Sequence, residues 1–358
     1  MIYKNSIWKG RNMPTNNNVK IKEIAEKLSL SVGTVSIVLN GRGDAMRISK
    51  ETQERVRTVA QEMNYQPNIF ARRLRNAGNG MPERVVGVFW NYLYADEIMS
   101  SIYRHLQEEA DSKRYRVEFI FRFFHPDKLF QERELLTSQQ FSGVIVYGIT
   151  DVDEDFLNNT VLNLPIVVLL RREENLHSIC LDDYAVGQNI ARLFMERGHK
   201  TAGYIGSHQR GRGATIRKLG FLEQCRQCGI QIKEQWVIDT PKRDYEGGFI
   251  AMKEIIEGKD YPSIMFISMP QQVIGTLNAC QKAGVRIPDD MEILAYGTYN
   301  YFNYLSPTIS CVYLPMECLA QTALDLLMTV LDKNIQMPIN RILHEEYCFR
   351  ESCGGFIE

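Results

Sequence analysis

The sequence predicts a small all-α head followed by a larger α/β body built of two doubly wound parallel-sheet lobes. Residues 19–40 contain two short amphipathic helix patterns joined by a tight turn. From Val85 onward, apolar strand patterns alternate with amphipathic helix patterns. This alternation is typical of parallel sheets with crossover helices, and roughly 270 residues of it usually divide into two lobes.

The composition, with 44% hydrophobic and 24% charged residues in 358, is that of a soluble globular protein. We find neither a signal peptide nor an apolar run of transmembrane length, so we expect a cytoplasmic protein without a membrane partner. The eight cysteines begin at Cys180 and should be free thiols. Cys225 and Cys228 form a CxxC pair without a second pair at zinc spacing, so we expect no metal and no cofactor.

The net charge of −1 is unevenly distributed along the chain. Residues 1–79 contain 14 Lys+Arg and 6 Asp+Glu, a net charge of +8, and the remaining residues carry −9. Neutralisation of phosphates by basic residues supplies most of the non-specific affinity for DNA. A basic N-terminal module on an acidic body therefore indicates DNA binding, with a chance charged face as the alternative.

The first two helix patterns form a helix-turn-helix. Ser31 ends the turn and can cap the second helix, because its hydroxyl can accept a free backbone N–H. The second helix turns Val35, Val38 and Leu39 inward. Its outward positions are small or apolar, namely Val32, Gly33, Thr34, Ser36 and Ile37. Such a second helix lies in the major groove of DNA, whereas the alternative is an ordinary helical hairpin within a larger core.

A third helix should begin near Ser49 and end before Pro67, because the residue before a proline is biased away from helix. The short basic stretch 68–75 predicts one further helix, and a Gly/Pro-rich linker follows it. The predicted organisation is a disordered extension at 1–18, a helix-turn-helix domain at 19–66, a hinge helix with linker at 67–83, and a two-lobed body at 84–358.

Within the body, we predict strands at 85–90, 117–123, 143–147, 165–170, 201–205, 264–267 and 292–295. Helices are predicted at 97–113, 130–139, 184–196, 215–228, 247–257, 273–283 and 316–331. The carboxyl ends of such parallel strands border a cleft in which small ligands bind. Arg210–Gly213 is glycine-rich and basic but fits no phosphate-loop spacing, so we interpret it as a loop at the edge of that cleft.

Residues 19–75 resemble, without a gap, the lactose-repressor/galactose-repressor (LacI/GalR) family of bacterial transcription factors. The body is similar to the same family at the segments 143–146, 165–171, 182–187, 198–200, 217–221 and 306–310, so that the resemblance covers about residues 19–340. It implies a homodimer or a tetramer that binds a pseudo-palindromic, double-stranded DNA operator. It also implies a body like a periplasmic binding protein, which holds a small-molecule effector.

The resemblance implies which residues contact DNA. Val32, Gly33 and Ile37 occupy the base-reading positions, and the hydroxyls of Thr34 and Ser36 can contact phosphates. Further contacts are implied for Asn40, Asn68, Ala71, Arg72, Leu74 and Arg75. Family members commonly have a long polar residue at the position of Ile37, suited to guanine. Because Ile37 cannot form a hydrogen bond, we expect it to pack on a thymine methyl group.

Leu74 matches the family's apolar wedge in the DNA minor groove. Insertion of such a side chain between base steps costs a few kcal/mol of unstacking, which the extra contacts of the bent DNA offset. The alternative is a linker residue that packs on the body. We therefore expect Leu74 to bend the operator.

The residues that line the ligand cleft are also implied by position, and they are Asn91, Tyr94, Arg171, Asp183, Arg217, Met269 and Tyr296. Arg217 resembles the arginine that holds effectors through its planar fork of N–H donors, with a surface arginine as the alternative. The family's Asn-Asp is Met269-Pro270 here, and its Gly-Phe-Asp is replaced by 295–297, so two carboxylates that usually bind sugar hydroxyls are missing. Three alternatives follow. The effector is not a plain sugar but a sugar derivative or another polar metabolite, or other residues hold it, or it does not exist.

Three functions are therefore open. The first is a transcriptional regulator, most often a repressor, whose operator affinity is set by an effector between the lobes. The second is a regulator of the same fold that responds to a protein partner instead. The third is a solute-binding protein or an enzyme. The missing signal peptide argues against a solute-binding protein, and the lack of a nucleophile–base pair or metal set leaves us with no catalytic residue.

Overall fold

The computed structural model describes residues 21–39, 43–44, 46–63, 84–138, 140–208, 211–297, 299–313 and 315–355. The chain divides into two compact units, Met1–Asn76 and Ala77–Glu358, which we describe separately. The predicted extension at 1–18 and the predicted hinge and linker at 67–83 lie outside the described residues.

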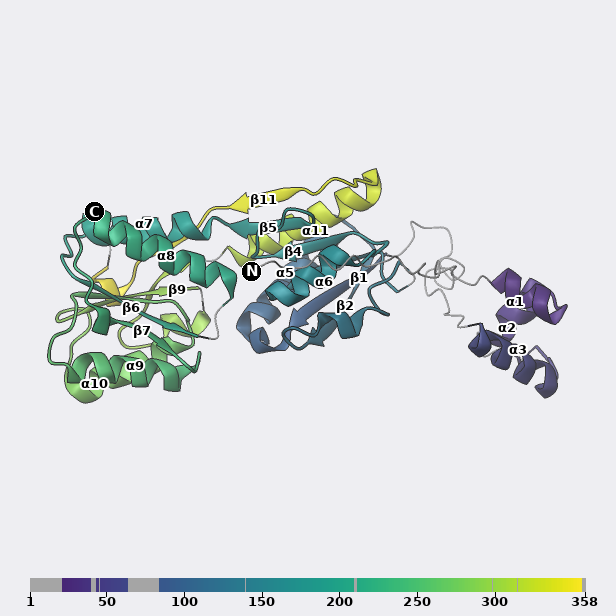
Figure 1. Cartoon of the computed structure of the whole chain (residues 1–358), viewed down its shortest axis with the longest axis horizontal. Helices are drawn as coiled ribbons and strands as arrows, with labels where there is room; N and C mark the ends of the chain where they lie inside the picture. Colours follow the sequence, from purple (N-terminus) through teal and green to yellow (C-terminus); the bar gives the residue numbers. More distant parts are fainter. Residues whose placement is uncertain are drawn as a thin grey trace, which may run out of the picture. The chain divides into compact units, whose positions relative to one another are not determined.

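The described part of the first unit is a bundle of three helices, α1 (Ile21–Leu28), α2 (Val32–Leu39) and α3 (Lys50–Glu62) (Figure 1). Each helix contributes fully buried side chains to one small core, for example Ile24 and Val56. The prediction for the cap of α2 is confirmed, because the Ser31 hydroxyl accepts a hydrogen bond from the Thr34 backbone N–H at 3.0 Å. Ser49 caps α3 in the same way and fixes its start.

The second unit contains two six-stranded sheets, each of which forms the centre of one lobe. The first sheet has the order β11-β5-β4-β3-β1-β2, and all its strands are parallel. Its strands are β1 (Arg84–Asn91), β2 (Val117–Phe124), β3 (Gly143–Tyr147), β4 (Ile166–Leu169), β5 (His177–Leu181) and β11 (Asn340–Leu343). The helices of this first lobe are α5 (Glu97–Ser112), α6 (Asp151–Asn159) and α11 (Met316–Lys333).

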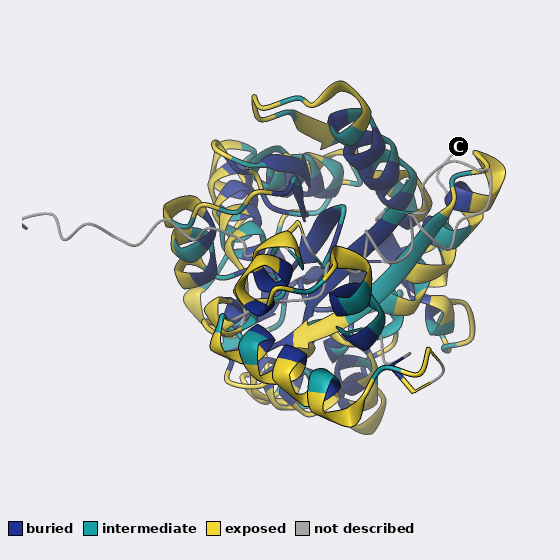
Figure 2. Ribbon diagram, turned by 90° about the vertical axis from the view of Figure 1, so that its right-hand side faces the viewer, coloured by how far each residue is buried: buried dark blue, intermediate teal, exposed yellow. Residues whose placement is uncertain are grey.

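The second sheet has the order β12-β10-β9-β8-β6-β7 and is parallel except where β12 pairs antiparallel with β10. Its strands are β6 (Ala202–Ser207), β7 (Val237–Thr240), β8 (Ile264–Ile267), β9 (Glu292–Tyr296), β10 (Ser310–Tyr313) and β12 (Glu346–Cys348). The helices of this second lobe are α7 (Asp183–Glu196), α8 (Arg212–Gln227), α9 (Tyr245–Glu257) and α10 (Gln272–Ala283). Figure 2 shows buried strands with helices around them whose outward faces are exposed.

The chain passes between the lobes three times. It leaves the first sheet after β5 to enter α7, returns after β10 through α11, and crosses again between β11 and β12. The paired lobes of mostly parallel strands agree with the predicted fold class. The antiparallel β12 departs from the strict alternation of the predicted pattern, because this short strand follows β11 directly without a helix.

Two close contacts between helices bring the polar residues of the second lobe together. Gly187 on α7 and Gly220 on α8 both lie in the α7–α8 contact, each against the backbone of the other helix. A Cβ at Gly187 would overlap the backbone oxygen of Arg217, and one at Gly220 would overlap that of Tyr184. The absence of both side chains lets the helices approach closely, which places Arg217 beside Asp183 at the start of α7.

The predicted helix at 130–139 was wrong. A short 3-10 helix at Leu129–Glu132 is followed by turns instead. The backbone of this stretch forms turns closed by hydrogen bonds three residues apart, such as that from the Leu135 N–H to the Glu132 oxygen at 2.9 Å. The helix α6 was not predicted. Its Asp153 accepts hydrogen bonds from the backbone N–H groups of Leu129 at 3.0 Å and Asp127 at 3.3 Å, just before these turns. Asp153 also completes a capping box with Thr150, a Thr-x-x-Asp signal that could have identified α6. The short strands β5, β7, β10, β11 and β12 were also missed.

Candidate functional sites

The exposed face of α2 is the candidate surface for contact with DNA. Val32 is 49% exposed at the start of the helix, and Gly33 beside it is also exposed. Thr34 and Ile37 are half-buried, and the Thr34 hydroxyl forms a 2.8 Å hydrogen bond with Ser31. The expected outward position of Ser36 was wrong, since this residue is buried. Because α2 packs against both α1 and α3, a wide stripe of its surface is covered.

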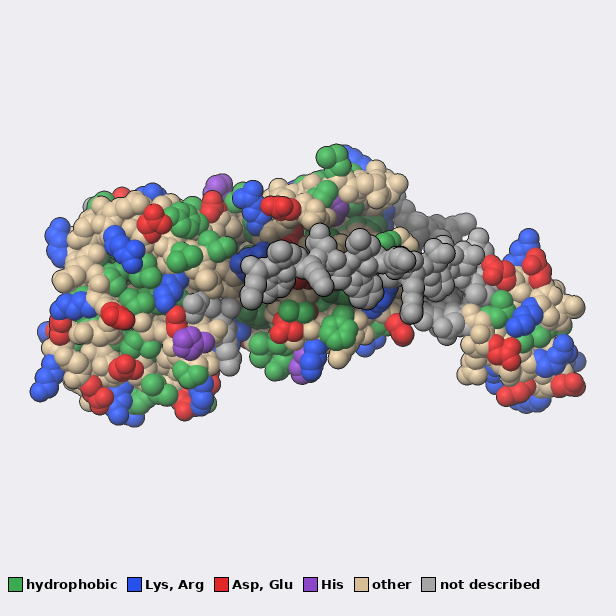
Figure 3. All heavy atoms as spheres, in the orientation of Figure 1, with side chains coloured by type: hydrophobic (Ala, Val, Ile, Leu, Met, Phe, Trp, Pro, Cys, Tyr) green, Lys and Arg blue, Asp and Glu red, His purple; other side chains and the backbone are tan. Residues whose placement is uncertain are grey.

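The described part of the head is electrically neutral. It contains six Lys+Arg and six Asp+Glu, and both signs are interspersed on its surface in Figure 3. The whole excess of positive charge in the N-terminal region therefore lies in residues 1–20, in Arg42 and in 72–75. The predicted DNA-contact residues Asn40, Asn68, Ala71, Arg72, Leu74 and Arg75 lie outside the described residues.

A cavity of about 140 Å³ lies between the two lobes of the body. Both sheets turn the carboxyl ends of their strands toward it, and residues that follow β1, β3, β4, β8 and β9 form its walls. Of the residues predicted for the cleft, the cavity wall contains Tyr94, Arg171, Asp183, Arg217, Met269 and Tyr296. The wall also contains Gly211–Gly213, which agrees with the interpretation of this segment as a loop at the cleft's edge. Arg210 lies outside the described residues.

Asn91 does not line the cavity, contrary to expectation. It is 1% exposed at the end of β1, and its side-chain amide donates to the backbone oxygen of Gly148 at 2.7 Å. Its side-chain oxygen accepts from the backbone N–H of Leu93 at 3.1 Å. Asn91 therefore links the end of β1 to the turn after β3, and this turn contributes Gly148 to the cavity wall.

Arg217 is 4% exposed, so it is no surface arginine. Its guanidinium donates to the carboxylate of Asp183, and its Cζ lies 3.3 Å from the centre of the Tyr296 ring. Burial raises the pKa of Asp183, and the positive charge of Arg217 opposes that rise. The Nε of Arg217 is buried without a hydrogen-bond partner among the described residues, so this arginine keeps one unused donor beside the cavity.

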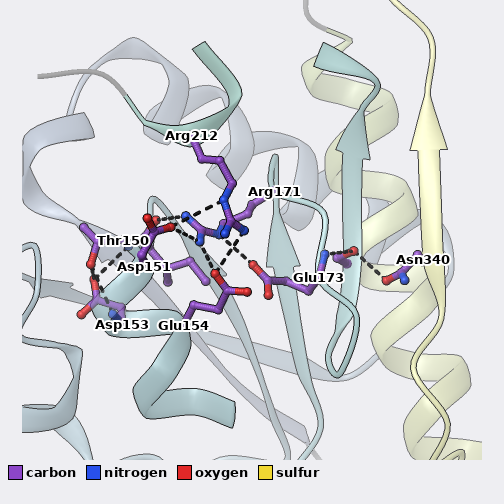
Figure 4. Close-up of polar contacts among 10 residues, drawn as sticks. Thr150, Asp151, Asp153, Glu154, Arg171, Glu173, Arg212 and Asn340 are labelled. Carbon is purple, nitrogen blue, oxygen red and sulfur yellow. Dashed lines mark hydrogen bonds and ion pairs between the residues drawn. The ribbon is translucent and has the colours of Figure 1, made fainter. Parts of the chain in front are cut away.

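Arg171 is held by a network of carboxylates (Figure 4). It donates to Asp151 at 2.6 Å, to Glu173 at 2.8 Å and to Glu154. Arg212 reaches the same carboxylates from the second lobe, at 3.1 Å from Glu154 and 3.6 Å from Asp151. Arg171 therefore lines the cavity as predicted, but its N–H groups already donate to carboxylates of the protein. Arg212 links the two lobes through its ion pair with Glu154.

Glu173 is the member of this network with the most perturbed acidity. Burial, together with the neighbouring Glu154, raises the pKa of Glu173 to about 7. The Oε2 of Glu173 is buried and has no donor to accept from within the described chain. Burial acts to raise the pKa of Glu154 as well, but its hydrogen bonds to Arg171 and Glu173 lower it overall. A proton on Glu173 that is shared with Glu154 explains both shifts.

Further contacts join the lobes on another side of the cavity. Asp96 of the first lobe accepts from Gln271 at 2.8 Å and from the Tyr299 hydroxyl at 2.7 Å. Glu97 accepts from the backbone N–H of Asn300 at 3.0 Å. The lobes are therefore closed on each other through protein side chains. Asp96 and Gln271 were not predicted as residues of this site, because their hydrogen bond joins positions that lie 175 residues apart in the chain.

The described residues hold no group of three or more His, Cys, Asp or Glu side chains that could bind a metal ion. All eight cysteines are free thiols, as predicted. Burial raises the pKa of the Cys225 thiol to about 12, which makes it a poor nucleophile and metal ligand. None of the described helices combines the length and the apolar character needed to cross a membrane.

Comparison with known proteins gives consistent matches for both units. Residues 20–68 match the family model of bacterial regulatory proteins of the lacI family, and residues 191–353 match a periplasmic binding protein-like domain. The probable HTH-type transcriptional repressor ExuR of Bacillus subtilis (strain 168) is 24% identical over 93% of this chain and 98% of its own length. The ribose operon repressor of Haemophilus influenzae is 26% identical over 86% of this chain and 90% of its own.

Solved structures agree on the fold. The crystal structure of the lac repressor dimer bound to operator and an anti-inducer superposes with a TM-score of 0.68 at 20% identity. The match covers 94% of this chain and 99% of that one. The likeness therefore includes the head as well as the two-lobed body.

Proposed function

This chain belongs to the LacI family of bacterial regulatory proteins, and we propose that it represses transcription by binding operator DNA as a homodimer. A small molecule bound between the two lobes of the body sets its affinity for the operator. The cavity supports control by a small molecule, because its walls come from both lobes and include buried polar atoms that have no partner among the described residues. Such a cavity with a few polar groups is typical of a small-molecule site.

In this proposal, residues 19–66 are the DNA-reading domain, 67–83 the hinge and 84–358 the effector and dimerisation domain. The α2 helices of two protomers read the half-sites of a pseudo-palindromic operator through Val32, Gly33 and Ile37. Residues of the hinge, with Leu74 as the wedge, read the minor groove between the half-sites. The protein acts in the bacterial cytoplasm at the nucleoid, where its operator lies.

The coupling between ligand and DNA runs through lobe closure. A ligand shifts the equilibrium between open and closed lobes only by its difference in affinity for the two. Closure changes the relative placement of the two hinges in a dimer, and hence the order of the hinge helices on DNA. Arg212 and Asp96 take part in this equilibrium, because both bridge the lobes in the closed form.

The test begins with capture of genomic DNA fragments by the full chain, followed by sequencing. We expect one or a few enriched sequences with two-fold symmetry. Thermal-shift screening with sugars, sugar acids, sugar phosphates and nucleosides then identifies ligands, and each hit is added to a DNA-affinity titration. Failure to enrich any specific sequence would refute the proposal as a whole.

A second candidate is a regulator of the same fold without a small ligand, tuned by a protein partner. The observation that favours it is the closed cleft. The cavity wall has Pro270 and Gly297 at the two positions where the resemblance implies carboxylates, and hydrogen bonds between protein side chains join the lobes. Specific DNA binding that no small molecule changes would support this candidate over the first.

A further inference from the structure

We infer that the ligand of the cavity is a small hydroxylated oxyanion, a carboxylate or a phosphate, and that Arg243 is the residue that binds its negative charge. This inference rests on the proposed control by a small molecule. Arg243 lies in the loop between β7 and α9, outside every motif that the sequence analysis singled out.

Among the described residues, four arginines line the cavity, and three of these have carboxylate partners within the protein. Arg171 and Arg212 share Asp151 and Glu154, and Arg217 is paired with Asp183. Among the described residues, Arg243 has no such partner. Its guanidinium instead stacks on the Tyr94 ring, with the Cζ 4.3 Å from the ring centre. Within the described chain, Arg243 is thus the arginine of the cavity wall whose charge has no carboxylate beside it.

The Nη1 of Arg243 is also buried without a hydrogen-bond acceptor in the described part of the chain. A guanidinium cannot lose its proton at ordinary pH, so a donor buried in this way is unfavourable until something accepts from it. Carboxylates and phosphates match the planar fork of arginine and accept two parallel hydrogen bonds. Because Tyr94 holds the plane of the guanidinium by stacking, the fork is oriented before the ligand arrives.

Other unpartnered atoms in the same wall complete the chemistry of the ligand. In the described part of the chain, the Nε of Arg217 is an unused donor, and the Ser268 hydroxyl has no partner although this residue is 1% exposed. The side-chain oxygen of Gln271 is an unused acceptor, which suits a hydroxyl group on the ligand. A cavity of about 140 Å³ resembles in size the ~150 Å³ cavity that accommodates one six-membered ring. These features favour a sugar acid or sugar phosphate over a nucleotide.

The experiment compares matched probes on the full chain by isothermal titration. Glucose and galactose are each used as the neutral sugar, the uronate and the 6-phosphate. We expect at least one charged probe to bind, and its neutral counterpart to bind at least about tenfold more weakly, because the bond to Arg243 is charge-assisted. The two charged forms distinguish a carboxylate from a phosphate ligand.

The variant Arg243→Gln should weaken the charged probe at least about tenfold, whereas the matched control Arg226→Gln removes an exposed arginine of α8 and should leave binding unchanged. The variant Arg243→Lys keeps the charge and should retain part of the affinity, which separates loss of charge from loss of folding. If a neutral sugar binds more tightly than its charged forms and also alters DNA affinity, the inference of an oxyanion ligand is refuted. The proposed control of DNA binding by a small molecule is then still supported. No binding by any probe would count against both.

Discussion

Replacement of Glu173 by glutamine should make the protein more stable at neutral and alkaline pH. Glu173 is 1% exposed, accepts from Arg171 at 2.8 Å and has a second oxygen that finds no donor among the described residues. A proton on that second oxygen can be donated to Glu154. The amide of glutamine reproduces this protonated form, because its oxygen accepts from Arg171 and its NH₂ group donates to Glu154 at every pH.

The magnitude follows from the difference in pKa between the folded and unfolded states. The pKa of Glu173 is about 7 in the folded protein, against an ordinary value of 4.5. Each pKa unit corresponds to ~1.4 kcal/mol, so the difference is about 3 kcal/mol. Between pH 4.5 and 7 the folded state binds more protons than the unfolded state. The free energy of unfolding therefore falls as pH rises through this window, and the loss is complete above pH 7.

Urea unfolding at pH 5, 6, 7 and 8 measures this effect. The variant Glu173→Gln should lack the decline that Glu173 contributes to the wild-type protein, so that the two proteins differ by up to about 3 kcal/mol more at pH 8 than at pH 5. Glu174→Gln is the matched control, because it removes a carboxylate from the exposed neighbouring position. Parallel pH profiles for the wild type and Glu173→Gln would refute the shared proton.

Three further predictions concern the head. Ser31→Ala removes the cap of α2 and should lower the stability of the three-helix bundle by about 1 kcal/mol, as measured by its thermal unfolding; an unchanged midpoint would contradict the role of the 3.0 Å hydrogen bond. Ile37→Arg should shift the preferred half-site toward guanine by about 1–3 kcal/mol in selection from random DNA, and an unchanged consensus would mean that this position does not read bases. Leu74→Ala should weaken specific binding and abolish operator bending, and an unchanged bend angle in a circular-permutation gel assay would exclude the wedge.

Periodicity and capping signals were sufficient for most of the fold. The strand Ile264–Ile267 and the helix Gln272–Ala283 agree with their predictions within one residue, because an uninterrupted apolar run and a clear apolar stripe specify them locally. The helix predicted at 130–139 was wrong, because the backbone there forms turns closed by hydrogen bonds three residues apart. The apolar spacing of this stretch fits both a helix and a series of turns, so local sequence does not distinguish them.

The same distinction applies to the candidate sites. Positions at the ends of strands, such as Tyr94 and Tyr296, could be placed near a cleft because parallel strands end on one side of a sheet. The state of a side chain could not be predicted in this way. Arg171 and Arg243 are both arginines at loop positions, yet carboxylates surround Arg171, whereas Arg243 has none beside it among the residues that the structure describes. Only the three-dimensional arrangement distinguishes Arg171, which is paired with carboxylates, from Arg243, which can bind a ligand.

The three passages of the chain between the lobes mean that neither lobe is encoded by a continuous segment of the gene. Residues 315–355 supply α11 and β11 to one lobe and β12 to the other. A premature stop codon near residue 314 would therefore remove an edge strand from both sheets at once. A deletion that aims to isolate one lobe leaves that lobe or the other incomplete. The two lobes that form the cavity can therefore be kept or removed only together.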